Sequence, residues 1–156
     1  MKLSVRATRG TAMTRDQKQL VRDTWQQVAP AAEATAELFY RRLFEIDPTT
    51  RRLFRTTNMF VQRRKLLHTL GFAVSGLDNL DVLLATVENL GRRHAGYGVT
   101  DAQYDSVGAA LLWTLEQRLG PTWTPEVASA WSEIYELLAA VMRGAGERKG
   151  IASRSA

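Results

Sequence analysis

The sequence predicts an all-α protein, and three observations support this class. Apolar residues recur at spacings of three and four along most of the chain, as on the buried side of a helix. Residues that cap or end helices separate these segments. No run of alternating apolar and polar residues indicates a strand. Together these features predict six or seven helices in 156 residues, a length that fits one domain.

The first two helices are marked by their starts. Thr14 is a suitable N-cap and Gln17 completes a capping box, so a helix should run from there to about Val28. Pro30 then begins a second helix, because proline is tolerated in a first turn. One side of this second helix is apolar and carries Ala36, Phe39, Tyr40, Leu43 and Phe44.

The middle of the chain predicts a corner and two further helices. Pro48 breaks the second helix, and a short helical turn through Phe54 should follow. Residues 55–58 predict a loop and residues 59–76 a helix. After a polar turn, residues 81–94 predict another helix.

The last two helices have clear starts. Thr100 caps one of them, and Gly120 followed by proline ends it. Thr124, again followed by proline, caps the last helix, which should end near Gly144. Its apolar side is formed by Val127, Trp131, Ile134, Leu138 and Val141.

The net charge of +5 is concentrated at the two ends of the chain. Residues 1–13 and residues 143–156 each contribute +3. We therefore expect a basic, disordered N-terminal extension over 1–13, a folded domain over 14–145 and a basic tail over 146–156. A basic domain face for nucleic acid is not indicated. Met13 is also a candidate for the true first residue.

Composition excludes several classes of site and location. The chain has no cysteine, so disulfides, thiolate metal sites and cysteine nucleophiles are absent. No apolar run approaches the roughly 18–20 residues of a membrane span, so no stable membrane insertion is expected. The first residues lack the apolar stretch of a secretory signal, and we expect a cytoplasmic location.

Only two histidines are present, and they differ in setting. His94 lies on the apolar stripe of Leu83, Val87 and Leu90, whereas His68 is expected at the surface. A histidine on an apolar face is most often a core residue with a satisfied hydrogen bond. One histidine does not suffice for a bare metal ion. It suffices as the axial ligand of a haem, where the porphyrin supplies four nitrogens.

Three segments, LFYRRLFEIDPTTRRLF, QRRKLLHTLG and NLGRRHAGYGV, follow one another in an order and spacing that resembles bacterial single-domain globins. These are similar to the globin domain of flavohaemoglobins. The later segments VTDAQYDSVGAALL and WSEIY fit the same family, and the resemblance covers residues 14–143 without a large gap. It implies a globin fold of six to eight helices around a haem pocket, with haem b (iron protoporphyrin IX) as the cofactor.

The resemblance also implies roles for individual residues. It places the proximal iron ligand at His94, the oxygen-binding side chains at Tyr40 and Gln62, and a haem-packing ring at Phe54. Further haem contacts fall on Leu66, Val99, Tyr104 and Tyr135.

The residues alone leave simpler interpretations open. Without the resemblance, Phe54 is better interpreted as a core residue, and a buried Tyr40 needs only some partner for its hydroxyl. Glutamine is usually exposed, although Gln62 shares a narrow arc with Leu66. The basic run 63–65 is favoured as a solvated face, with haem propionates as the alternative partner.

The implied function is reversible, high-affinity oxygen binding, with nitric oxide and carbon monoxide as further ligands. The alternative is an enzyme, a nitric oxide dioxygenase that makes nitrate and draws electrons from a separate flavin reductase. A haem-based gas sensor ranks third, because neither short tail is long enough for an output domain. The family's glutamate near the end of the last helix falls on Gly146, and we expect the adjacent Glu147 beyond the helix end. This departure speaks against efficient dioxygenase chemistry.

Overall fold

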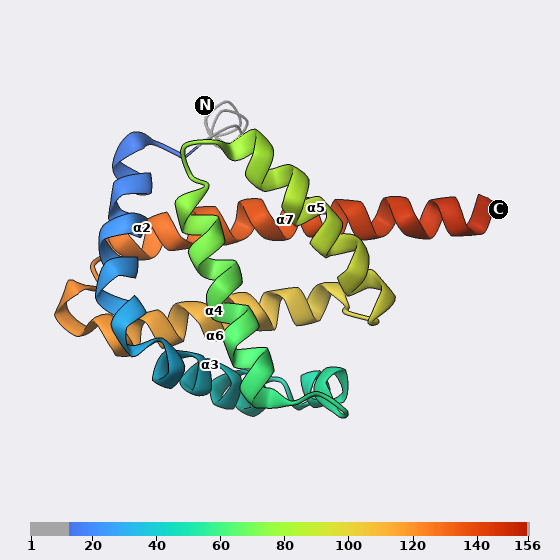
Figure 1. Cartoon of the computed structure of the whole chain (residues 1–156), viewed down its shortest axis with the longest axis horizontal. Coiled ribbons are helices and arrows are strands. Elements are labelled where there is room, and N and C mark those ends of the chain that lie inside the picture. Colours follow the sequence, from blue (N-terminus) through green and yellow to red (C-terminus); the bar gives the residue numbers. More distant parts are fainter. Residues whose placement is uncertain (1–12, 156) are drawn as a thin grey trace.

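The computed structural model describes residues 13–155, with the side chains of residues 13–145, and every regular element in that part is helical. Three short 3-10 helices join six α-helices. The α-helices, labelled as in Figure 1, are α2 (Arg15–Val28), α3 (Ala32–Ile46), α4 (Met59–Ser75), α5 (Leu80–Gly96), α6 (Asp101–Leu119) and α7 (Pro125–Ser155). The predicted all-α class is confirmed.

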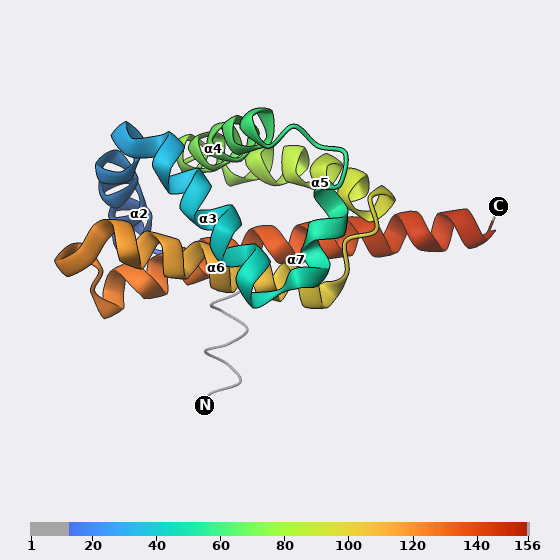
Figure 2. The same ribbon diagram turned by 90° about the horizontal axis from the view of Figure 1, so that it is seen from below.

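The helices form two layers, helix packed on helix. Figure 2 shows α4 and α5 on one side and α6 and α7 on the other, with α2 and α3 towards one end. α5 packs along α7, α3 packs along α6, and α4 contacts α3 and α2. The layers therefore bring α3 and α4 to one side of the interior, and α5 with α7 to another.

The main core is formed by buried residues of α2, α3, α6 and α7. The indole Nε1 of Trp131 donates a hydrogen bond to Thr24 Oγ1 at 2.9 Å, and that hydroxyl donates to Leu20 O at 2.7 Å. Both polar groups are thus satisfied in the interior, as buried polar groups must be. Met13 is only 5% exposed and belongs to the same core, so the folded domain includes one residue of the predicted extension. Residues 1–12 lie outside the described residues.

Local signals predicted most helix starts correctly. Thr14 and Thr100 both form capping boxes, and the corner after Pro48 is the 3-10 helix η2 (Pro48–Phe54). Pro30 was expected to begin the second helix, but it lies in the 3-10 helix η1 (Ala29–Ala31), and α3 begins at Ala32. The missing amide hydrogen of a proline interrupts the α-helical ladder, which explains the tight turn between α2 and α3.

The prediction that the last helix ends near Gly144 is wrong. α7 continues to Ser155 and projects beyond the other helices in Figure 1. A glycine inside a helix costs only about 1 kcal/mol relative to alanine, so Gly144 is a weak stop signal between good helix formers. Position 147 therefore lies in the helix and not beyond its end. Within the described residues no helix is both long and apolar enough to cross a membrane.

Candidate functional site

The structure brings Tyr40 and Gln62 together from two different helices. Tyr40 lies on the buried face of α3 and is 6% exposed. Gln62 lies in the first turn of α4, which begins where the Asn58 side chain accepts hydrogen bonds from the backbone N–H groups of Phe60 and Val61. The Gln62 amide Nε2 donates to the Tyr40 hydroxyl at 3.1 Å. This contact joins α3 to α4, and its two residues are 22 positions apart in the sequence.

The Tyr40 hydroxyl keeps a proton that it can donate. Burial raises the pKa of Tyr40, and the Gln62 hydrogen bond opposes this only in part. The hydroxyl is therefore neutral, and no acceptor for its O–H lies among the residues that the structure describes. Leaving a buried donor without a hydrogen bond costs about 1–3 kcal/mol. A small ligand with an acceptor atom would bind favourably at this point.

Aromatic side chains surround this pair. The Tyr40 ring lies 4.9 Å from the Phe39 ring and 5.4 Å from the Phe54 ring, both edge to face, and 6.1 Å from Phe44. Phe54 is half-buried and comes from η2, so the corner after Pro48 places it there. Leu66, one turn beyond Gln62, is half-buried against the same core. The two donors thus lie in an apolar setting, where hydrogen bonds are stronger than in water.

His94 lies near the end of α5 with its ring fixed by the helix itself. The ring nitrogen Nδ1 is 2.9 Å from Leu90 O, and since a carbonyl only accepts, Nδ1 carries the hydrogen. Burial lowers the pKa of His94 and the Arg93 charge lowers it further, whereas the hydrogen bond to Leu90 O raises it. The imidazole is therefore neutral, with a lone pair on Nε2. Val99, half-buried, donates its backbone N–H to His94 O at 3.2 Å.

One glycine sets the position of this histidine. Gly91, one turn before His94, lies against α7 so closely that a Cβ would be 2.6 Å from Met142 Cα and Met142 O. Real Cβ atoms do not approach backbone that closely. Any larger residue would push α5 away from α7 and move His94 with it.

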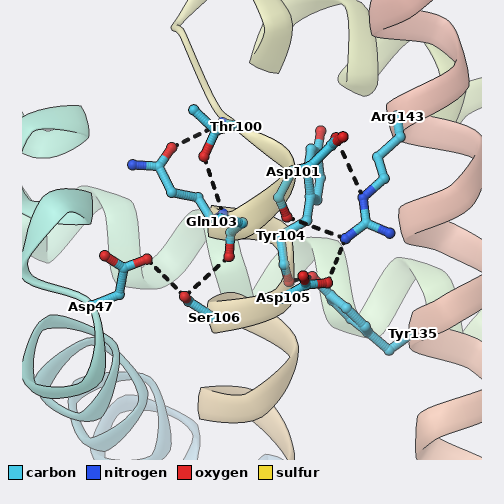
Figure 3. A network of polar contacts seen from close by, with 10 residues as sticks. Asp47, Thr100, Asp101, Gln103, Tyr104, Asp105, Ser106, Tyr135 and Arg143 are labelled. Atoms are coloured by element: carbon cyan, nitrogen blue, oxygen red, sulfur yellow. Dashed lines mark hydrogen bonds and ion pairs between the residues drawn. The ribbon is translucent and has the colours of Figure 1, made fainter.

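Tyr104 and Tyr135 are held by a network that the sequence analysis missed (Figure 3). The Arg143 guanidinium of α7 pairs with Asp105 at 2.7 Å and with Asp101 at 3.7 Å, and it lies 5.2 Å from the centre of the Tyr104 ring. Tyr135 donates its hydroxyl hydrogen to Tyr104 O. The spacing of four between the two aspartates at a helix start was the available signal for a basic partner.

The other half of the network joins the corner to α6 (Figure 3). The Ser106 hydroxyl donates to Asp47 Oδ2 at 2.7 Å, and Gln103 Nε2 donates to Thr49 Oγ1 at 3.2 Å. Hydrogen bonds from Thr49 and then Ser106 lower the pKa of the Asp47 carboxyl. These contacts fix η2, and so the position of Phe54, relative to α6.

The remaining charged candidates all lie on α4. His68, Arg64 and Lys65 are exposed, as expected of a solvated face. Arg63 differs from its neighbours, because it is half-buried and pairs with Glu33 at 3.5 Å. The described residues contain no group of three His, Cys, Asp or Glu side chains that could hold a metal ion.

The side chains therefore fit one kind of prosthetic group. A single neutral histidine nitrogen is too little for a bare metal ion and sufficient for a metal already held in a macrocycle. The apolar rings suit a flat, apolar group, and the Tyr40–Gln62 pair adds two hydrogen-bond donors. In fold and side-chain set this is a helical protein of the haem-pocket class.

Comparison with known proteins gives the family. The family model for Globin matches residues 37–142, a stretch that includes every candidate site residue. The chain belongs to the globin family.

Its relatives include neuroglobins and a flavohemoprotein. The neuroglobins of Danio rerio and Chaenocephalus aceratus are each 31% identical over 146 residues, which is 85% of this chain and 92% of theirs. The flavohemoprotein of Halalkalibacterium halodurans is 30% identical over 131 residues, covering 83% of this chain but 32% of that protein. The crystal structure of a hexacoordinated heme protein from an anhydrobiotic tardigrade at pH 4 has the same fold. Its TM-score is 0.76 at 18% identity, over 86% of this chain and 96% of that one.

Proposed function

We propose that this globin binds haem b through His94 and reversibly binds oxygen with high affinity next to Tyr40 and Gln62. The observation that carries the proposal is the Gln62–Tyr40 hydrogen bond, which leaves a buried O–H available to a ligand. The neutral His94 ring with its free Nε2 supports it from another helix. The names of two similar proteins, a flavohemoprotein and a hexacoordinated heme protein, agree with this use of the site.

The composition excludes one form of haem. Covalent attachment of a c-type haem needs a C-x-x-C-H motif, and the chain has no cysteine. The proposed group is haem b, the form that the resemblance implies, and it would be held by one bond from His94 and by packing. When bound, haem supplies an iron with four porphyrin nitrogens and two axial positions, one of which can take a diatomic gas.

On the His94 side, the protein fixes the direction and the charge of the ligand atom. Leu90 O holds the Nδ1 hydrogen, so the ring cannot rotate freely and Nε2 is the atom that points outward from the bond. Burial keeps the ring neutral by lowering its pKa. Both effects favour a bond from Nε2 to a metal.

On the Tyr40 side, the protein supplies hydrogen bonds to a polar gas ligand. Gln62 donates to the Tyr40 oxygen, which makes the Tyr40 O–H a better donor, because linked hydrogen bonds polarise one another. A hydrogen bond to a polarised diatomic ligand contributes about 1–3 kcal/mol, or roughly tenfold to a hundredfold in affinity. Carbon monoxide is less polar when bound and gains less, so the pocket should favour oxygen.

The test is an absorption spectrum of the purified chain supplied with haem, reduced, and then exposed to air. We expect a stable oxygenated spectrum in the wild-type chain and in His68→Ala, whose histidine is exposed. We expect its loss in His94→Ala. A wild-type chain that takes up no haem would overturn the proposal, and the site residues would then be core residues only.

A second candidate is nitric oxide dioxygenase activity, favoured by the 30% identity to a flavohemoprotein. One nitric oxide, one oxygen and one electron give one nitrate, and a separate flavin reductase would supply the electron. Nitrate formed with a reductant present would support this enzyme. A bacterial single-domain type and a cytoplasmic location belong to the proposal in either case, and a gas sensor ranks below both.

A further inference from the structure

One segment of the domain is basic without any acidic residue. Residues 48–77, from η2 through α4, contain six arginines and lysines and no aspartate or glutamate. The remainder of residues 14–142 contains eight basic and fifteen acidic residues. The near-neutral charge of the domain therefore conceals a basic segment beside an acidic remainder.

The outer face of α4 carries two of these basic residues, a histidine and unexpected apolar side chains. Phe60, Val61 and Phe72 are 53%, 44% and 39% exposed. At 100° per residue they share an arc of roughly 140° with the exposed Arg64, Lys65 and His68. We call these six residues the outer α4 face. Gln62 and Leu66 lie outside this arc and reach the interior.

The exposed cations of this region have no acidic partner among the described residues. Arg64 lies over the Phe60 ring at 5.8 Å, and Arg51 lies over Phe44 at 5.0 Å. Arg52 and Arg55, also exposed, flank α4 from the preceding corner. Arg63 shows the contrast, because it does pair with Glu33. A patch that combines exposed rings with unpaired arginines has the composition of a protein interface.

We propose that the outer α4 face, with the flanking cations of the corner, docks the acidic face of an electron-donor flavoprotein. The inference rests on the proposed function, which requires ferrous iron. In the encounter the reduced flavin loses one electron, ferric iron gains it, and the flavin proton goes to solvent; no atom is transferred. α4 lies at the outside of the molecule in both views (Figures 1 and 2), so a partner can reach it. Only one helix diameter, about 10 Å, then separates the partner from the side of α4 that carries Gln62.

The composition of the face favours an acidic protein over other anionic surfaces. A membrane-surface helix inserts a continuous apolar side, but the buried side of α4, with Ala73 and Val74, already packs in the core. The exposed apolar residues are interrupted by Arg64, Lys65 and His68. A long nucleic acid would also meet the acidic remainder of the domain. A compact acidic protein meets only the basic face, and opposite charges raise its association rate.

The test measures binding of an acidic flavodoxin to the haem-loaded full chain by calorimetry, at low and at physiological ionic strength. We expect Arg64→Glu with Lys65→Glu to weaken binding about tenfold or more, and Phe60→Ser to weaken it at both ionic strengths. The matched control is Arg15→Glu with Arg118→Glu, which changes the charge equally at two exposed sites elsewhere. We expect the control to change binding less than about twofold.

Several results would overturn the proposal. Equal losses in both double variants would mean that only net charge matters. Binding to phosphatidylserine vesicles or to DNA, with none to the flavodoxin, would assign the face to another anionic partner. Absence of all flavodoxin binding would also overturn it. Absorption spectra of the same samples report haem uptake separately, so failure of the proposed function is distinguishable from failure of the docking surface.

Discussion

The region around His94 and the region around Tyr40, here called the His94 side and the Tyr40 side, are built differently. On the His94 side, the frame depends on backbone: Gly91 lies against the Met142 backbone, and the Tyr135 hydroxyl bonds to Tyr104 O. On the Tyr40 side, the contacts are between side chains: ring packing with Phe54 and one hydrogen bond from Gln62. Changes on the Tyr40 side should therefore alter the proposed ligand contacts and leave the fold intact. Changes on the His94 side should move helices.

The largest effect is expected at Gly91. In Gly91→Ala the new methyl would be 2.6 Å from Met142 Cα, and overpacking of this kind costs about 1–3 kcal/mol of unfolding free energy. Chemical denaturation measures it. Gly71→Ala is the matched control, because its Cβ would lie 3.8 Å from the Trp25 side chain, an ordinary contact, and helical alanine is favoured over glycine. Equal stability of the two variants would mean that the close contact of Gly91 with the Met142 backbone does not hold α5 against α7.

The next effect is expected at Tyr40 and concerns ligand release. Tyr40→Phe removes one donor and leaves the ring, so the oxygen dissociation rate of the haem-loaded chain should rise about tenfold to a hundredfold. Its unfolding free energy should fall by no more than about 1.5 kcal/mol, since one buried hydrogen bond is lost. Stopped-flow dissociation and denaturation measure the two quantities. An unchanged dissociation rate would remove Tyr40 from the ligand site.

How far the sequence predicted this molecule depends on the range of each interaction. Caps at Thr14 and Thr100 are contacts over three residues, so local pattern predicted them. The place of Tyr40 beside Gln62 was expected only from the resemblance, because spacing within one helix contains no information about a neighbouring helix. The Arg143 network was missed for the same reason, since its partners are 38 and 42 residues away. The ligand-binding roles of Tyr40 and Gln62 stay predictions.

A smaller effect is expected from pH, and it again concerns the His94 side. Burial lowers the pKa of His94 below its ordinary value of 6.5, so the folded haem-free chain binds this proton less readily than the unfolded chain. The stability that the neutral ring contributes is complete above the unfolded pKa and is lost as the pH falls through the folded pKa. Denaturation between pH 7 and 5 should therefore show falling stability. The unfolding free energy of His94→Gln should fall less steeply over that range. An identical dependence on pH in both chains would contradict the expectation.

The smallest effect is expected at Arg143, although it contacts Asp101, Asp105 and the Tyr104 ring (Figure 3). Its partners Asp101 and Asp105 have side chains that are 82% and 79% exposed, so solvent screens both ion pairs. Arg143→Met keeps an unbranched apolar side chain and removes the guanidinium, with both ion pairs and its contact with the Tyr104 ring, so it should cost less than about 1 kcal/mol. The cost should shrink further at 1 M salt, where the Debye length is about 3 Å. A larger loss that salt does not reduce would mean that the guanidinium acts as a packed part of the frame. The His94 side would then depend on this side chain as well as on its glycine and its backbone contacts.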